Sequence, residues 1–271
     1  MKILVSSEWL NDTINNRDLV ILDASQKTNL TKADIAFENI QIKNARSFNL
    51  KENFSDTTSS LPNMLPSPRK FEKEARILGI NNSSILVIYD DLGVYFSPRV
   101  WWMFKTMGHQ KVYVLNGGLT DWISKGFNVE PKTRKSYILG NFVASFNSKA
   151  VKSLDAIKKN IELKDAILID ARSNKRFEGI APEPRKEIPS GSIKNALNIP
   201  YETVLKNGYY KNKEDLIAIF KEKNIDNRPL IFSCGSGVTA CIILLAGELV
   251  LKNQKSVYDG SWTEWATNQL K

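Results

Sequence analysis

Short apolar runs alternate with longer amphipathic stretches along most of this 271-residue chain. The runs at residues 85–89, 112–115, 167–170, 229–233 and 256–258 predict short buried strands. The stretch 153–163 predicts a helix that Ser153 caps, and 239–251 predicts another helix. Strands that alternate with helices indicate an α/β fold, with a mainly parallel sheet that helices cover on both faces.

The same pattern occurs twice along the chain, in the same order and with nearly the same spacing. The matching pairs are VILDAS (20–25) with ILIDAR (167–172), IKNA (42–45) with IKNA (193–196), ILVIYD (85–90) with PLIFSC (229–234), and GGLTDW (117–122) with GSWTEW (260–265). One duplicated domain explains this order better than chance. We therefore expect two tandem domains at residues 1–130 and 149–271, joined by a polar linker at 131–148.

Composition narrows the possible functions. The net charge is +9, but the basic residues are scattered among acidic ones and no basic-aromatic motif occurs, so we expect no nucleic-acid partner. No apolar run approaches spanning length, because Glu248 interrupts the best candidate, so we expect no membrane partner. The apolar stretch at the N-terminus is too short for a signal peptide, which favours a cytoplasmic location. Two cysteines form neither a disulfide framework nor a metal cluster.

Cys234 is the strongest candidate for chemistry. It opens the segment CGSGVT (234–239) between the predicted strand 229–233 and the predicted helix 239–251. Unpaired amides and the positive end of a helix dipole would stabilise negative charge on the sulfur. The alternative is a small buried hydrophobe. Gly235 and Gly237 favour the first interpretation, because glycines let a loop fold around a bound anion.

The CGSGVT loop and the duplicated pattern resemble the rhodanese superfamily of sulfurtransferases, and in particular its 3-mercaptopyruvate branch. The resemblance covers nearly the whole chain and implies two tandem rhodanese-like domains. It implies that Cys234 carries sulfur as a persulfide and that Ser236 assists as a catalytic residue. The loop residues expected to bind the substrate and the outer sulfur are Gly235, Gly237, Val238 and Thr239. In the thiosulfate branch basic residues follow the cysteine, whereas here the two following residues are uncharged.

Two arginines are candidates for binding the substrate: Arg176, in RFEG (176–179), and Arg185, in PEPR (182–185). The resemblance maps both to substrate arginines. Guanidinium groups match the carboxylate and carbonyl of a 2-oxo acid in pairs of hydrogen bonds. The alternative is two surface arginines in a polar loop. Arg172 is expected to brace the domain by pairing with an acid, and Asp170 to cap the loop after its strand.

The first copy departs from the second where chemistry is expected. Asp90 occupies the place of Cys234 and cannot accept sulfane sulfur, so the first domain is expected to be a non-catalytic partner that closes over the site. Trp101 and Trp102 are expected to be core anchors. Gln41 and Ser192 replace the histidines of the family's HIPGA elements, and His109 is expected in a surface turn. Histidine base catalysis is therefore not expected.

These observations predict a sulfurtransferase that moves sulfur from 3-mercaptopyruvate to a thiol, such as reduced thioredoxin, or to cyanide, and releases pyruvate. No cofactor or metal is expected. Two alternatives stay open at this point: a thiosulfate:cyanide sulfurtransferase, and a degenerate rhodanese pair that serves as a binding or regulatory module. A related loop serves cell-cycle phosphatases, but these need an arginine where Ala240 stands, so phosphatase activity is not expected.

Overall fold

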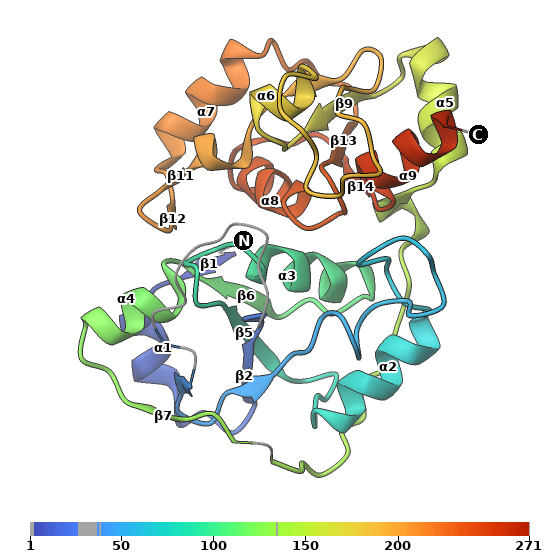
Figure 1. Ribbon diagram of the computed structural model, residues 1–271. Helices are drawn as coiled ribbons and strands as arrows, with labels where there is room; N and C mark the ends of the chain where they lie inside the picture. The colour runs from blue at the N-terminus through green and yellow to red at the C-terminus, as the bar shows by residue number, and fades with distance from the viewer. Residues whose placement is uncertain (1–2, 27–36, 38, 134, 271) are drawn as a thin grey trace. The chain divides into compact units, whose positions relative to one another are not determined.

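The computed structural model describes residues 3–26, 37, 39–133 and 135–270, and these form two compact units. Unit 1 contains the described residues of Met1–Thr57, Leu65–Asn147 and Asn207–Tyr210. Unit 2 contains those of Thr58–Met64, Ser148–Lys206 and Lys211–Lys271. Each unit thus includes one short segment from the other half of the sequence, and Figure 1 colours the chain so that both can be followed.

The elements of the two units follow one another in a similar order. Those of unit 1 are β1 (Leu4–Val5), α1 (Ser7–Thr13), β2 (Leu19–Asp23), β3 (Ile40–Ile42), β4 (Arg46–Ser47), α2 (Pro68–Ile77), β5 (Ile85–Tyr89), α3 (Ser97–Thr106), β6 (Val112–Leu115), α4 (Gly118–Ser124), β7 (Val129–Pro131) and β12 (Tyr209–Tyr210). Those of unit 2 are η1 (Ser148–Ala150), β8 (Val151–Lys152), α5 (Leu154–Leu163), β9 (Ile167–Asp170), α6 (Asn174–Phe177), β10 (Leu197–Asn198), η2 (Tyr201–Val204), β11 (Leu205–Lys206), α7 (Lys213–Glu222), β13 (Leu230–Ser233), α8 (Ala240–Val250), β14 (Lys255–Tyr258) and α9 (Ser261–Gln269).

Each unit is built on a five-stranded sheet, and the two sheets have the same topology. The strand order is β1-β6-β5-β2-β4 in unit 1 and β8-β14-β13-β9-β10 in unit 2, and all of these neighbours pair in parallel. The register is also equivalent. Asp23 pairs with Tyr89 in unit 1, and Asp170 pairs with Ser233 in unit 2. The predicted tandem α/β fold and the predicted duplication are therefore confirmed.

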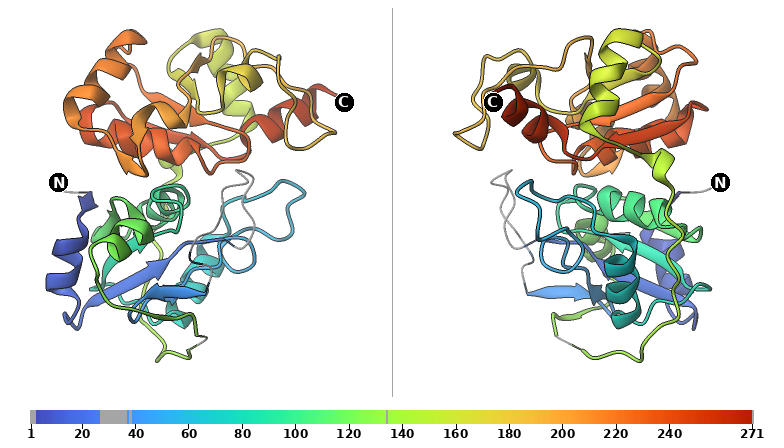
Figure 2. Two further views of the ribbon diagram at one scale, coloured as in Figure 1. Left: turned by 60° about the vertical axis from the view of Figure 1, so that its left-hand side comes forward. Right: turned by 90° about the vertical axis from the view of Figure 1, so that its right-hand side faces the viewer.

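Helices flank both sheets, as the views in Figures 1 and 2 show. The central strands are buried along almost their whole length, as parallel strands covered on both faces must be. One core of unit 1 joins the sheet to α1 and α4 through Leu10 and Trp122. Its counterpart in unit 2 joins the sheet to α5 and α9 through Ile157 and Trp262. The duplicated pattern thus produces duplicated cores.

Several local predictions are confirmed and one is wrong. Ser153 caps α5, because its side chain accepts a hydrogen bond from the N–H of Ala156. Trp101 and Trp102 are buried. His109 does not lie in a surface turn. It is 4 % exposed, its Nε2 lies 2.8 Å from the carbonyl oxygen of Ser84, and its ring packs against aromatic rings. Burial lowers the pKa of His109 below its ordinary value.

The stretch predicted as the linker follows β7 and packs along unit 1. The N–H of Gly140 donates to the carbonyl of Arg76, and Phe142 is buried. Across the described ranges of the chain, no helix is both long enough and apolar enough to cross a membrane. The same ranges contain no group of three or more histidine, cysteine or acidic side chains suited to a metal ion.

Candidate active site

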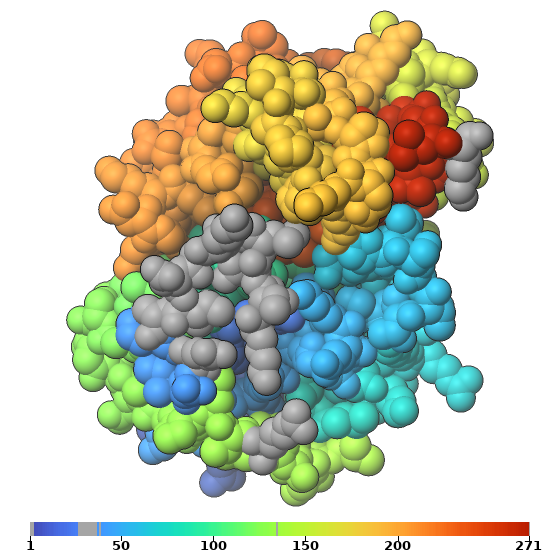
Figure 3. All heavy atoms as spheres, viewed as in Figure 1, coloured from blue at the N-terminus to red at the C-terminus, as the bar shows by residue number. Residues whose placement is uncertain are grey.

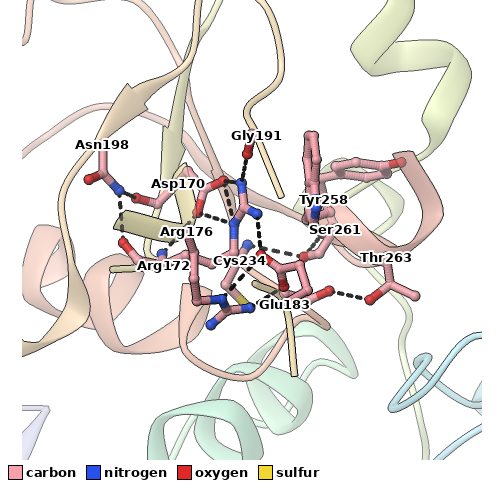
Figure 4. A network of polar contacts seen from close by, with 12 residues as sticks. Asp170, Arg172, Arg176, Glu183, Gly191, Asn198, Cys234, Tyr258, Ser261 and Thr263 are labelled. Carbon is pink, nitrogen blue, oxygen red and sulfur yellow. Dashed lines mark hydrogen bonds and ion pairs between the residues drawn. The ribbon is translucent and has the colours of Figure 1, made fainter. Parts of the chain in front are cut away.

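Cys234 stands at the carboxyl end of β13, the middle strand of the unit 2 sheet. Side chains at the carboxyl ends of parallel strands meet at one edge of the sheet, which is where such folds bind ligands. The thiol is unpaired, and the residue is 2 % exposed. Figure 4 shows Cys234 among polar side chains from several elements of the unit.

The start of α9 holds the backbone of the cysteine in place. The hydroxyl of Ser261 accepts a hydrogen bond from the N–H of Cys234 at 3.2 Å, and the N–H of Trp262 donates to the carbonyl of Cys234 at 2.9 Å. The carbonyl of Gly235 accepts from both the N–H and the hydroxyl of Thr263, at 3.1 and 2.6 Å. Amides at a helix start lack partners within the helix, so these two are used to fix the loop.

The rest of the loop turns sharply toward α8. Gly237 has φ +79°, a conformation that L side chains rarely adopt, which explains the glycine there. Val238 is buried, and Thr239 immediately precedes the first residue of α8. The hydroxyl of Ser236 accepts a hydrogen bond from the side-chain amide of Asn63 at 3.1 Å. The loop therefore connects the end of a strand to the start of a helix, as the sequence predicted.

Arg176 belongs to a buried network of two arginines and two acids (Figure 4). Arg172, fully buried, donates to both carboxylate oxygens of Asp170 and to Glu183 at 2.8 Å. The other side of Glu183 pairs with the guanidinium of Arg176. The predicted bracing role of Arg172 is seen directly, and Asp170 also accepts from the N–H of Arg172, as a cap of the loop would.

The guanidinium of Arg176 lies against the loop that follows Cys234. A Cβ atom on Gly235 would be only 2.9 Å from Nη2 of Arg176. Burial works against the charged form, but hydrogen bonds and the charge of Glu183, together with the sulfur of Cys234, raise the pKa of Arg176 above its ordinary value. A permanent positive charge therefore stands beside the cysteine, and Gly235 leaves room for it.

Arg185 reaches the same loop through one intermediate residue. Its Nη1 donates to the hydroxyl of Thr263 at 3.3 Å, and that hydroxyl in turn donates to the carbonyl of Gly235. The segment that carries both arginines, residues 174–195, lies at the surface of unit 2 (Figure 3, yellow to gold), where Ile180 is 70 % exposed. The loop of Cys234 and the two guanidinium groups thus lie close to a segment that is exposed to solvent.

Sequence reasoning missed three residues of this site. Glu183 lies inside the PEPR motif but was not assigned a role, although two arginines depend on it. Thr263 and Asn63 lie far from the loop in sequence, and the repeat that contains Thr263 does not indicate its contact with the loop. Gln41, in contrast, lies in unit 1, where its amide donates to the carbonyl of Ala45 and to Glu130.

Unit 1 contains a second loop at the place equivalent to Cys234. There Asp90 is fully buried, and its carboxylate accepts hydrogen bonds from four backbone amides. The donors are the N–H groups of Leu92, Tyr95, Phe96 and Ser97, at 2.8–3.2 Å. Burial outweighs these bonds and raises the pKa of Asp90 above its ordinary value. This loop surrounds a carboxyl group of the chain itself with backbone N–H donors.

Comparison with known proteins shows which family this chain is related to. A family described as "Rhodanese-like domain" matches residues 6–125 and again 153–268. The chain is 37 % identical to mitochondrial thiosulfate/3-mercaptopyruvate sulfurtransferase 1 of Arabidopsis thaliana, over 97 % of this chain and 76 % of that one. It is also 37 % identical to 3-mercaptopyruvate sulfurtransferase of Mus musculus, over 97 % and 92 %. The crystal structure of SseA from Escherichia coli, a 3-mercaptopyruvate sulfotransferase with the rhodanese fold, superimposes with a TM-score of 0.86 at 34 % identity, over 97 % of this chain and 99 % of that one.

Proposed function

The chain belongs to the rhodanese-like family, and we propose that it is a sulfurtransferase that takes sulfur from 3-mercaptopyruvate and passes it to a thiol. One observation carries the proposal. Arg176 lies against the loop of Cys234, and Arg185 is tied to the same loop through Thr263. A nucleophile whose loop is approached by one guanidinium group directly and by a second through Thr263 suits a small substrate that bears a carboxylate and an adjacent carbonyl.

The first half-reaction loads the cysteine. The thiolate of Cys234 attacks the sulfur of the donor and forms an S–S bond. The C–S bond of the donor breaks, and its electron pair goes to carbon, which gives pyruvate enolate. The proton of the donor thiol balances this charge, so that pyruvate leaves and Cys234 holds a persulfide. Arg176 and Arg185 bind the donor, and the hydroxyl of Ser236 donates a hydrogen bond to it.

Unit 1 suggests which amides hold the outer sulfur. Asp90 and Cys234 occupy equivalent places, and the amides that bind Asp90 correspond to those of Ser236, Thr239, Ala240 and Cys241. Of these, the N–H of Cys241 already donates to the carbonyl of Val238. A cysteine side chain has one soft acceptor atom where aspartate has two oxygens, so it engages fewer of these donors itself. We infer that the loop from Gly235 to Thr239 and the start of α8 meet the negative charge of the persulfide.

The second half-reaction empties the cysteine. An acceptor thiolate attacks the outer sulfur, takes it as a new persulfide and leaves the thiolate of Cys234. The proposed acceptor is a thiol, such as reduced thioredoxin, and cyanide would serve as an alternative one. A cytoplasmic location also stays a prediction, supported by two cysteines that form no disulfide. These steps use the sulfur of Cys234 and side chains of unit 2, and they require no organic cofactor.

Donor preference is the sharpest test. Thiosulfate is a dianion and would need additional positive charge in the loop itself, whereas Gly235 and Ser236 carry no charge and Arg176 is paired with Glu183. We expect a higher specificity constant for 3-mercaptopyruvate than for thiosulfate. The assay compares pyruvate release from 3-mercaptopyruvate, with dithiothreitol as acceptor, against thiocyanate formation from thiosulfate and cyanide. Preference for thiosulfate would make the chain a thiosulfate:cyanide sulfurtransferase. Use of neither donor would favour a binding or regulatory module.

A further inference from the structure

Ser236 has a side-chain partner that comes from a distant part of the sequence. The segment Thr58–Met64 belongs to unit 2 and brings in Asn63, which lies 173 residues before Ser236. The Nδ2 atom of Asn63 lies 3.1 Å from the hydroxyl oxygen of Ser236 and 3.4 Å from its backbone carbonyl oxygen. Asn63 has φ +58°, a left-handed conformation that asparagine adopts more readily than most residues.

The second of these contacts fixes the direction of the first. A backbone carbonyl only accepts hydrogen bonds, so the amide nitrogen of Asn63, not its oxygen, must face Ser236. The hydroxyl of Ser236 therefore accepts from Asn63. A serine hydroxyl has one proton and two acceptor sites, so its proton remains available to another acceptor.

We propose that Asn63 is a positioning residue: it holds Ser236 as an acceptor, so that the serine proton is directed to the oxygen of the donor that becomes negative when the C–S bond breaks. This role rests on the proposed function. The amide contributes no proton of its own to the reaction and does not titrate, so the partner of Ser236 adds no ionisation to the pH profile. Stabilisation of a developing oxyanion acts on the chemical step more than on donor binding.

The test uses full-length protein with 3-mercaptopyruvate as donor and dithiothreitol as acceptor. Asn63→Ala removes the amide, and we expect kcat for pyruvate release to fall about 3- to 10-fold, as expected for one hydrogen bond, while KM changes little. Asn63→Asp keeps the size but presents oxygens that only accept, which forces the serine to donate to the carboxylate. We expect this variant to be at least as slow as Asn63→Ala. Ser60→Ala, an exposed change in the same segment, is the matched control and should behave as wild type.

A background variant separates positioning from a general structural effect. In protein that already carries Ser236→Ala, adding Asn63→Ala should leave kcat unchanged, because there is no hydroxyl left to position. A further drop in that background, or full activity of both Asn63 variants, would overturn the inference. If wild-type protein releases no pyruvate from 3-mercaptopyruvate, the proposed function fails. If wild-type protein is active and the Asn63 variants are equally active, the role of Asn63 is wrong but the proposed function stands.

Discussion

The two loops at the carboxyl ends of β5 and β13 share a framework and differ in the side chain that it holds. Each loop contains a left-handed glycine at the same place, Gly93 with φ +91° and Gly237 with φ +79°. In each, an amide at the start of the last helix of the domain donates to the residue at the strand end: Leu119 to Asp90, and Trp262 to Cys234. The first loop satisfies its own amides with a carboxylate.

A comparison of the two loops separates the hydrogen bonds that the backbone provides from the charges that the side chains provide. The four amides that bind Asp90 show that this backbone directs several donors to one side chain, although burial still raises the pKa of that carboxyl group above its ordinary value. The charged side chains that would select a substrate occur around the second loop, where Arg176 lies against Gly235. The position after Asp90 in the first loop is instead the acidic Asp91. The backbone framework is thus common to both loops, and we propose that chemistry is confined to the second one.

The largest loss of activity is expected when the sulfur atom of Cys234, which the first loop lacks, is removed. Cys234→Ser removes the sulfur carrier with almost no change in shape, so sulfur transfer should fall below detection while the unfolding transition is preserved. Pyruvate release and circular dichroism measure the two outcomes. Cys241→Ser, in α8, is the matched control and should keep most of the activity. Turnover in Cys234→Ser would contradict the assignment.

The arginines should give the next largest effect. Losing a charge-assisted hydrogen bond costs on the order of 1.5–3 kcal/mol, which is roughly a 10- to 100-fold loss in kcat/KM for 3-mercaptopyruvate. We expect Arg185→Ala to cause a larger loss in kcat/KM than Arg176→Ala, because Glu183 already neutralises much of the charge of Arg176. Lys186→Ala, an exposed neighbour, is the control. Unchanged kinetics in both arginine variants would place the carboxylate of the donor elsewhere.

Asp91 provides a pH-dependent test of the first loop. Burial and the charges of Asp90 and Asp23 raise its pKa from 3.8 to about 6. The folded protein therefore holds this proton more tightly than the unfolded chain does. Ionisation costs folding free energy, and the cost grows as pH rises from about 4 and is complete above about 6.

Asp91→Asn should accordingly stabilise unit 1 at pH 7–8 by about 1–2 kcal/mol, once the partial exposure of Asp91 is allowed for. The gain should shrink as the pH falls toward about 4, where wild type is protonated as well. Urea unfolding of both proteins across this pH range measures it. A gain that is constant over the range would mean that the ionisation of Asp91 is not its source.

The smallest effect concerns Thr263, whose equivalent in unit 1 is the exposed Thr120. Thr263→Val keeps the shape but removes the hydroxyl between Arg185 and Gly235, so KM for 3-mercaptopyruvate should rise about 2- to 5-fold. Thr263→Ser should restore wild-type kinetics. Thr120→Val removes the same hydroxyl from the other copy and should leave KM unchanged. If the two valine variants changed KM equally, Thr263 would not be part of the substrate-binding site.

Patterns within short stretches of sequence were enough to predict the fold and the place of Cys234 directly after a buried strand. The repeated motifs predicted two copies of one α/β domain, and the glycines beside Cys234 indicated an anion-binding loop. His109 was misplaced because its neighbours look like a turn, whereas its burial depends on Ser84 and on aromatic rings brought in by packing. Polar neighbours in sequence do not reveal such contacts.

The rest of the site depends on residues that only the folded chain brings together. Asn63 reaches Ser236 from 173 residues away, and nothing in its own segment predicts this contact. Thr263 lies in a repeated motif whose other copy has no arginine to bind. The resemblance pointed to Gln41 as the residue in place of a histidine, but Gln41 bonds within unit 1. Side-chain contacts over such separations follow from tertiary packing and carry no periodic signal.

The central claim is that the difference between Asp90 and Cys234 confines sulfur transfer to the second loop. The most direct measurement is mass spectrometry of peptides from protein treated with 3-mercaptopyruvate in the absence of an acceptor. The account predicts one added sulfur atom on the peptide that contains Cys234, none on Cys241 when the two are resolved by fragmentation, and loss of the addition after dithiothreitol. Sulfur found on Cys241 alone, or no added sulfur while pyruvate is still released, would contradict it.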